Sequence, residues 1–225
     1  MLRTWLQRWA LPQHCVLCGA VGDMLCQPCH DDLPGLRFER CPSCGAAEVR
    51  SEVCGQCLAH PPRFSKVAVA ASYGFPLDAV IKRFKYGRDL SLVAPLAALL
   101  SERVANEMRP DYLVSMPLSA ERLRERGFNQ SQEIAHRVAG QLGLAIAPAI
   151  CRRIRNTPPQ ADLPLSERRG NIRGAFSCAA NLDGARIAVV DDVLTSGASL
   201  NELARTLLRA GAAEVTGWIV ARTER

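Results

Sequence analysis

The stretch that decides the fold class is IAVVDDVLTSGASL, which runs from Ile187 to Leu200. Four apolar residues that suit a buried strand lead directly into two acids, and a run of small and hydroxyl-bearing residues follows. Gly197 permits a tight turn, and the N–H groups of residues 194–199 precede a predicted helix, whose N-terminus favours an anion. We therefore predict a strand, an anion-holding loop and a helix, in that order.

Strand and helix patterns alternate on both sides of this stretch. Apolar runs and one-sided apolar spacing predict, in chain order, strand 67–73, helix 77–86, helix 90–108, strand 111–117, helix 129–142, strand 186–192, helix 199–211 and strand 214–221. Pro95 falls in the first turns of its helix, where proline is tolerated. The alternation predicts an α/β fold with a mostly parallel sheet, whose ligands bind beyond the carboxyl ends of the strands. We expect Asp191 and Asp192 at that edge.

Eight of the ten cysteines form four CxxC pairs near the start of the chain. The pairs are Cys15 with Cys18, Cys26 with Cys29, Cys41 with Cys44, and Cys54 with Cys57. Two such knuckles supply the four-sulfur shell that zinc prefers, so eight ligands indicate two structural zinc ions. Short spacers of seven and nine residues favour pairing in sequence order, while crossed pairing stays open because spacing does not determine connectivity.

Disulfides and redox-active CxxC pairs are the alternatives to zinc. Disulfides need an oxidising compartment, and the opening MLRTWLQRWALP lacks the unbroken apolar stretch of a signal peptide. A redox CxxC normally opens a helix in a βαβ unit, whereas these pairs lie among Pro, Gly and Asp. We therefore predict zinc, which supplies local stability because large apolar side chains are few here. Cys151 and Cys178 lie far from any pair and are predicted to be plain buried thiols.

Length and hydropathy set the broad organisation. The 225 residues suffice for a small zinc-ribbon module over 1–62 and one α/β domain over 63–225. No run of eighteen apolar residues occurs, so we expect no membrane span and a cytoplasmic protein. The apolar residues of the first segment share one face of a short helix; they are Leu2, Trp5, Leu6 and Trp9. That helix either packs on its own protein or anchors to a membrane surface.

The formal net charge of +6 is unevenly distributed. Residues 1–60 hold five Lys/Arg and six Asp/Glu, whereas residues 121–173 hold ten Arg and five Asp/Glu. The middle of the chain therefore provides a local field for anions, or else a set of solvated surface arginines.

The opening stretch has the side chains that a sugar phosphate requires. Asp191 and Asp192 can accept hydrogen bonds from a sugar diol, and the hydroxyls of Thr195, Ser196 and Ser199 can donate to phosphate oxygens. The order of acids and then phosphate loop suits a ribose 5-phosphate. A P-loop is excluded because no Lys follows the glycine. A dinucleotide-binding fingerprint is excluded because no GxGxxG follows a strand. The alternative is an ordinary helix cap followed by a turn.

The two acids followed by TSGxS resemble the phosphoribosyl-diphosphate signature of type I phosphoribosyltransferases, with Ser199 where many members carry Thr. Further motifs are similar to those of the ComF family of competence-associated, phosphoribosyltransferase-like proteins. These motifs are Pro117-Leu118, RLRERGFNQS (122–131), TPPQADLPLSERRGNIRGAF (157–176), FKYGRD (84–89) and the leading cysteine module. The resemblance covers nearly the whole chain.

This resemblance implies a phosphoribosyl-diphosphate site with Mg²⁺. The segment after Met116 is expected near the diphosphate, together with Leu118, Arg122, Arg124 and Arg126, since guanidinium groups suit diphosphate. The polar segment that begins at residue 157 is interrupted by prolines and is expected to close over the site or merely to cover the sheet. The residues of its motif are Thr157, Gln160, Leu165, Arg169 and Asn171. No catalytic residue is assigned. A solvated helix face and ligand contact are equally expected for Lys82, Arg83 and Lys85.

The resemblance leaves several functions open. It implies a role in natural transformation, with single-stranded DNA and competence or recombination proteins as partners. The chain is then a phosphoribosyl transferase with an unnamed acceptor, or a metabolite-sensing or nucleic-acid-binding protein that uses the same fold. A salvage phosphoribosyltransferase and a purely structural docking module are the remaining alternatives. Aromatic residues make up 5% of the chain, which limits the platforms for base stacking.

Overall fold

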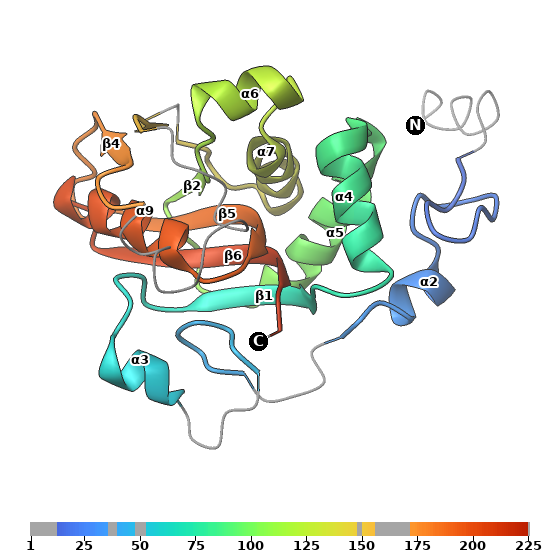
Figure 1. Ribbon diagram of the computed structural model, residues 1–225, viewed down its shortest axis with the longest axis horizontal. Coiled ribbons are helices and arrows are strands. Elements are labelled where there is room, and N and C mark those ends of the chain that lie inside the picture. The colour runs from blue at the N-terminus through green and yellow to red at the C-terminus, as the bar shows by residue number, and fades with distance from the viewer. Residues whose placement is uncertain (1–12, 36–39, 48–52, 148–149, 156–171, 225) are drawn as a thin grey trace.

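The computed structural model describes residues 13–35, 40–47, 53–147, 150–155 and 172–224. Its centre is a four-stranded parallel sheet in the order β1-β6-β5-β2 (Figure 1). The strands are β1 Val67–Ser72, β2 Tyr112–Ser115, β5 Arg186–Leu194 and β6 Glu214–Arg222. The predicted α/β class with a mostly parallel sheet and a leading cysteine-rich module is confirmed.

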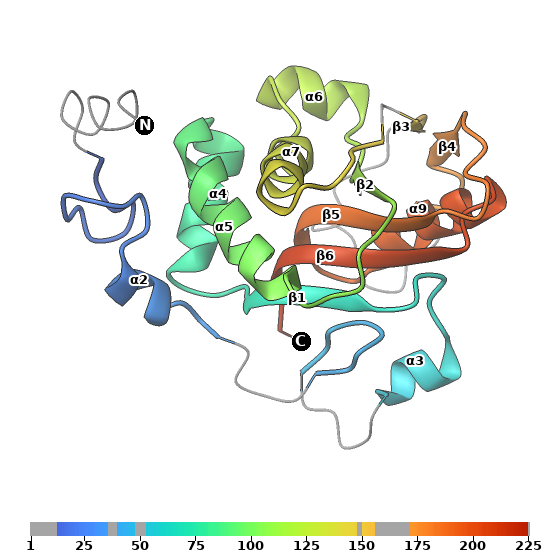
Figure 2. The ribbon, with the colours of Figure 1, turned by 180° about the vertical axis from the view of Figure 1, so that it is seen from behind.

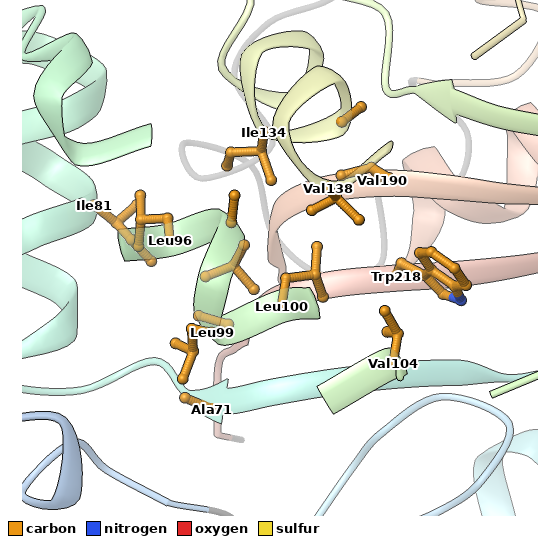
Figure 3. Close-up of a cluster of buried hydrophobic side chains, with 14 of the residues drawn as sticks. Ala71, Ile81, Leu96, Leu99, Leu100, Val104, Ile134, Val138, Val190 and Trp218 are labelled. Atoms are coloured by element: carbon orange, nitrogen blue, oxygen red, sulfur yellow. The ribbon is translucent and has the colours of Figure 1, made fainter. Parts of the chain in front are cut away.

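Helices cover both faces of this sheet. The helices α4 Leu77–Gly87, α5 Val93–Val104 and α7 Gln130–Leu142 share one hydrophobic cluster, and α9 Ala198–Arg209 belongs to the other. The side chains of β5 alternate between the two clusters. Ala188 and Val190 pack in the cluster of the three helices, and Ile187 and Val189 pack in the cluster of α9. Figure 3 shows residues of the first cluster, among them Val190 and Trp218 of the sheet, Ile134 and Val138 of α7, and Leu100 of α5.

The single helix predicted over 90–108 is wrong at both ends. A 3₁₀ turn, η1 Leu90–Leu92, precedes α5, because the side chain of Asp89 accepts a hydrogen bond from the N–H of Ser91 at 3.2 Å. At the other end the N–H of Ala105 bonds to the carbonyl of Glu102, and this tighter spacing ends the helix at Val104. The other predicted strands and helices are confirmed within a few residues of their bounds.

Short elements that the sequence did not predict complete the fold. They are α2 Gln27–Asp31, α3 Gly55–Ala59, α6 Ala120–Arg126, β3 Cys151–Arg153 and β4 Phe176–Cys178. The strands β3 and β4 pair antiparallel, and Cys151 lies opposite Cys178. Cys151 is buried as predicted, whereas Cys178 is only partly buried. Burial, and then the neighbouring Cys178 thiol, raise the pKa of Cys151. The amino-terminal helix predicted over the first residues lies outside the described residues.

The two cysteine ribbons contact different parts of the α/β domain. The first ribbon and α2 lie beside α4 and α5, where Val16, Leu17 and Leu25 pack on the first cluster (Figure 2). The second ribbon runs along β1, and the N–H of Val67 donates to the carbonyl of Pro42 at 3.1 Å. β1 is the edge strand of the sheet, so the second ribbon covers backbone groups that would otherwise be exposed.

The tight fit of this second ribbon yields a stability test. A Cβ on Gly45 would lie 2.9 Å from Cγ2 of Val69, whereas Gly19, at the matching position of the first ribbon, has nothing within 4 Å. Both glycines have positive φ, so alanine strains the backbone at each of them. We expect Gly45→Ala to lower the free energy of unfolding by about 1–3 kcal/mol more than Gly19→Ala does.

Urea denaturation of the two zinc-loaded variants measures this difference. Equal losses of stability in the two variants would contradict the close packing of the second ribbon on β1.

Candidate functional site

The candidate site lies where β5 ends and α9 begins. Asp191 and Asp192 lie near the carboxyl end of β5. Gly197 is the N-cap of α9 and has a φ of 77°, a left-handed conformation that glycine adopts without strain. The N–H of Ala198 donates to Oγ of Ser196 at 3.3 Å, which organises the first turn. The acids and the N-terminus of α9 therefore lie at the same edge of the sheet.

Two helices on one face of the sheet hold the acids in place. Oγ of Ser131, on α7, donates to Oδ1 of Asp191 at 2.8 Å. Nζ of Lys85, on α4, lies 2.8 Å from Oδ1 of Asp192, whose side chain is 9% exposed. A buried charge is costly unless it is paired, so Lys85 offsets the burial of Asp192.

The environment of Asp191 disfavours the ionisation of its carboxyl group. Removal from water, followed by the charge of Asp192, raises the pKa of Asp191 to about 7. Lys85 and the hydroxyl of Ser131 act in the opposite direction and limit this rise. Asp191 therefore exchanges its proton near neutral pH, which is typical of a group in a functional site.

A cavity of about 630 Å³ opens beside the acids. The predicted donor-site residues that line it are Asp191, Asp192, Thr195, Ser199, Leu118, Arg122 and Arg126. Ser196 and Gly197 line a different cavity of about 170 Å³, between the loop and the second ribbon. The ends of β2 and β5 thus meet α6 and α9 around the larger cavity. Two of the predicted loop residues, Ser196 and Gly197, face the smaller cavity instead.

Helix α6 brings cations to the cavity. Oγ of Ser119 accepts from the N–H of Arg122 at 3.4 Å and caps the helix, which carries two arginines to the cavity wall. The guanidinium of Arg126 donates to Oε1 of Gln130 at 3.0 Å and lies 5.5 Å from the centre of the Tyr86 ring. The cavity therefore has acids at one side and arginines at another.

The sequence did not assign several residues that surround the acids. Lys85 and Ser131 lie within the motifs FKYGRD and RLRERGFNQS, but the strand pattern alone could not show that they reach Asp192 and Asp191. The neighbours of Lys85 behave differently, because Lys82 pairs with Asp78 and Arg83 with Asp89. The predicted closing segment lies outside the described residues from Thr157 to Asn171.

Arg153 is a further cation near the acids, and no local motif marks it. Its guanidinium lies 5.9 Å from the centre of the Phe176 ring, across the β3–β4 pair. Burial and then the like charge of Arg122 lower the pKa of Arg153, while Asp191 acts in the opposite direction. Arg153 therefore interacts electrostatically with Arg122 and Asp191, although it lines another cavity, of about 620 Å³, and not the cavity beside the acids.

The eight paired cysteines form two separate four-sulfur groups. Cys15, Cys18, Cys26 and Cys29 make one group, Cys41, Cys44, Cys54 and Cys57 make the other, and the sulfurs of each lie within 4.8 Å of one another. This confirms the pairing in sequence order. The sulfurs of Cys18 and Cys26 are 3.7 Å apart, as are those of Cys44 and Cys54. Tetrahedral zinc with Zn–S bonds of about 2.3 Å separates its sulfurs by about 3.8 Å, so both groups fit zinc.

Among the described residues, none of the helices combines the length and the apolar character that crossing a bilayer requires.

Comparisons with known proteins agree with the cysteine module and cover most of the chain. The family model of the double zinc ribbon domain matches residues 6–58. The chain is 35% identical over 194 residues to the DNA utilization protein YhgH of Salmonella typhimurium, and this match covers 83% of the chain and 86% of that protein. The protein of the same name from Salmonella typhi is 36% identical over the same shares. Competence protein F of Haemophilus influenzae is 31% identical over 208 residues, 88% of this chain and 90% of that protein.

The matches to these relatives extend well beyond the length of the zinc-ribbon family model. With more than four fifths of its length matched at 31% identity or above, the chain belongs to the ComF family of competence protein F and DNA utilization protein YhgH.

Proposed function

We propose that the cavity beside Asp191 and Asp192 binds phosphoribosyl diphosphate with Mg²⁺. The observation that carries this proposal is that an acid pair, hydroxyl groups and arginines from separate segments line one cavity. A ribose diol needs acceptors, a 5-phosphate needs N–H and hydroxyl donors, and a diphosphate needs cations. The cavity presents these three groups in that combination.

Each group has a defined task in this proposal. The carboxylates of Asp191 and Asp192 accept from the diol, and Thr195 and Ser199 donate to the 5-phosphate with the N–H groups at the start of α9. Arg122 and Arg126 bind the diphosphate. Carboxylate oxygens beside phosphates suit Mg²⁺, which when bound neutralises the charge of the leaving diphosphate. In a transfer, a nucleophilic atom of the acceptor forms a bond to the anomeric carbon as the bond from that carbon to diphosphate breaks and diphosphate leaves with the electron pair. The protein contributes orientation and electrostatic stabilisation.

The relatives, whose names refer to DNA utilization and competence, support the proposal of a role in DNA use. We propose single-stranded DNA as a second ligand, at the mouth of the same cavity. Tyr86 lines the cavity and is 72% exposed, and Lys82 and Arg88 line the same cavity. An exposed ring among cations is what base stacking and phosphate contact require. Eight cysteines held as thiolates suit a reducing compartment, and we propose the cytoplasm.

Removal of the two carboxylates tests the donor site. We expect Asp191→Asn/Asp192→Asn to weaken phosphoribosyl-diphosphate binding by roughly 10- to 150-fold, because a hydrogen bond to a charged group contributes about 1.5–3 kcal/mol. Isothermal titration calorimetry with Mg²⁺ measures the change. The matched control is Asp183→Asn on the exposed turn before β5, where asparagine tolerates the positive φ of this position. Equal affinities in the wild type and the double variant, or no binding by either, would refute the site.

The titration of Asp191 predicts a pH dependence of donor binding. The ionised carboxylate is the better acceptor for the diol, so affinity should rise with pH up to about 7 and level off above it. Below that value the loss approaches tenfold per pH unit as a single proton blocks the site. Asp192→Asn removes the charge that opposes ionisation, and the rise should therefore move to lower pH. Calorimetry between pH 5.5 and 8.5 compares the two proteins, and an unshifted curve in the variant would count against this assignment.

The aromatic residue at the cavity mouth tests DNA binding. We expect Tyr86→Leu to weaken binding of a short single-stranded oligonucleotide by about 1–3 kcal/mol, the range for loss of one stacked base. The matched control is Tyr112→Leu, because Tyr112 is also exposed but is the first residue of β2. It therefore lies at the amino ends of the strands, whereas the cavity lies at their carboxyl ends. Fluorescence anisotropy over a salt series gives both affinities. Binding that does not respond to salt, or equal losses in the two variants, would exclude this DNA site.

A further inference from the structure

One buried arginine connects the second cysteine ribbon to the loop of the candidate site. Arg222 is the last residue of β6 and is 1% exposed. Its Nε donates to the carbonyl of Cys44 at 3.1 Å, and its Nη1 donates to the carbonyl of Leu194 at 2.9 Å and also to that of Thr195. A single guanidinium therefore bridges a zinc-ligand knuckle and the first residues of the phosphate loop.

The charge of this arginine suits a zinc-loaded ribbon. The acceptors just described are neutral carbonyls. The carboxylate of Glu224 is near enough for the charge of Arg222 to help lower its pKa, and any further negative charge beside Arg222 also offsets the cost of burying a cation. Four thiolates around one Zn²⁺ carry a net charge of −2, because four negative charges meet two positive ones. Arg222 lines the same cavity of about 170 Å³ as Cys44 and Cys57, and Ser196 and Gly197 form another part of its wall. The loaded second site is thus a source of negative charge beside Arg222.

We propose that Arg222 is a positioning residue through which zinc at the second four-cysteine site orders the 194–199 loop for anion binding. The loaded ribbon stabilises the guanidinium, and the guanidinium holds the loop carbonyls so that the hydroxyls of Thr195 and Ser199 face the donor cavity. This inference rests on the proposed function, since its readout is phosphoribosyl-diphosphate binding.

The first four-cysteine site provides the internal comparison. Its ribbon packs on the side of α4 and α5, where Nε2 of His30 lies 3.5 Å from Oε2 of Glu102 (Figure 2). Zinc at the first site therefore stabilises a different surface from the one that carries the loop. The two ribbons are alike in ligands and differ in what they touch, so the loss of one zinc ion from each can be compared directly.

Paired cysteine variants separate the two sites. Cys54→Ser/Cys57→Ser and Cys26→Ser/Cys29→Ser should each retain one zinc equivalent, as counted with a chromophoric chelator after denaturation. Calorimetry with phosphoribosyl diphosphate and Mg²⁺ should show about 5- to 150-fold weaker binding for the second-site variant, the usual range of coupling between two sites. The first-site variant should lose much less, remaining within about twofold of the wild type, because the contacts of the first ribbon described above are with α4 and α5 and not with the 194–199 loop.

Arg222 itself is tested by a thermodynamic cycle. Arg222→Met keeps much of the side-chain length but removes the donors, so it should weaken donor binding, and adding Cys54→Ser/Cys57→Ser should cause little further loss. Arg222→Lys, which retains the charge, should recover part of the affinity. Additive losses from the arginine and cysteine variants would refute the link.

A measurement on the wild type avoids any variant that fails to fold. Coupling is reciprocal, so saturating phosphoribosyl diphosphate and Mg²⁺ should slow the release of zinc to a chelator from the second four-cysteine site. The rate of zinc release from the first site should stay unchanged. The Asp191→Asn/Asp192→Asn variant controls for zinc binding by the added diphosphate. If the wild type binds the donor but releases zinc at equal rates with and without it, the proposed role of Arg222 is refuted and the proposed function is not affected. Absence of donor binding by the wild type would instead refute the proposed function.

Discussion

The central constraint on this protein is the burial of β5 between β2 and β6. Parallel pairing on both sides satisfies the backbone of β5, and its alternate side chains enter the two hydrophobic clusters. The apolar run of residues 187–190 ends before β5 does. Asp191 and Asp192 are therefore still part of the strand and lie at a partly buried edge of the sheet. The placement of the cavity, the helices above it and the loop after it all depend on this strand.

Burial of two adjacent acids requires compensation from other elements. Lys85 and Ser131 provide it from α4 and α7, whose apolar faces are held by the same cluster that contains Val190. The packing of these helices therefore also determines the electrostatics of the site. The incomplete compensation of Asp191 leaves its pKa about 7, so the site is sensitive to protonation in the range where proteins normally work.

The cysteine module contributes to the sheet as well as to metal binding. The second ribbon shields the edge strand β1 and reaches Arg222 at the end of β6, whereas the first ribbon covers α4 and α5. A small segment with few large apolar residues acquires order from metal ligation, and it then supports surfaces of the α/β domain. The two ribbons share one ligand chemistry but serve different parts of the structure.

The sequence by itself determined the fold class, the four CxxC pairs and the acid pair with its loop. These features are local: hydrophobic periodicity, CxxC spacing and an acid–hydroxyl motif are each visible within a short window. Only the tertiary structure decided that Lys85 and Ser131 reach the acids, that Arg153 lies near them and that Arg222 joins a ribbon to the loop. These contacts join residues far apart in the chain, and their geometry depends on how helices pack on the sheet, which no short window of sequence contains.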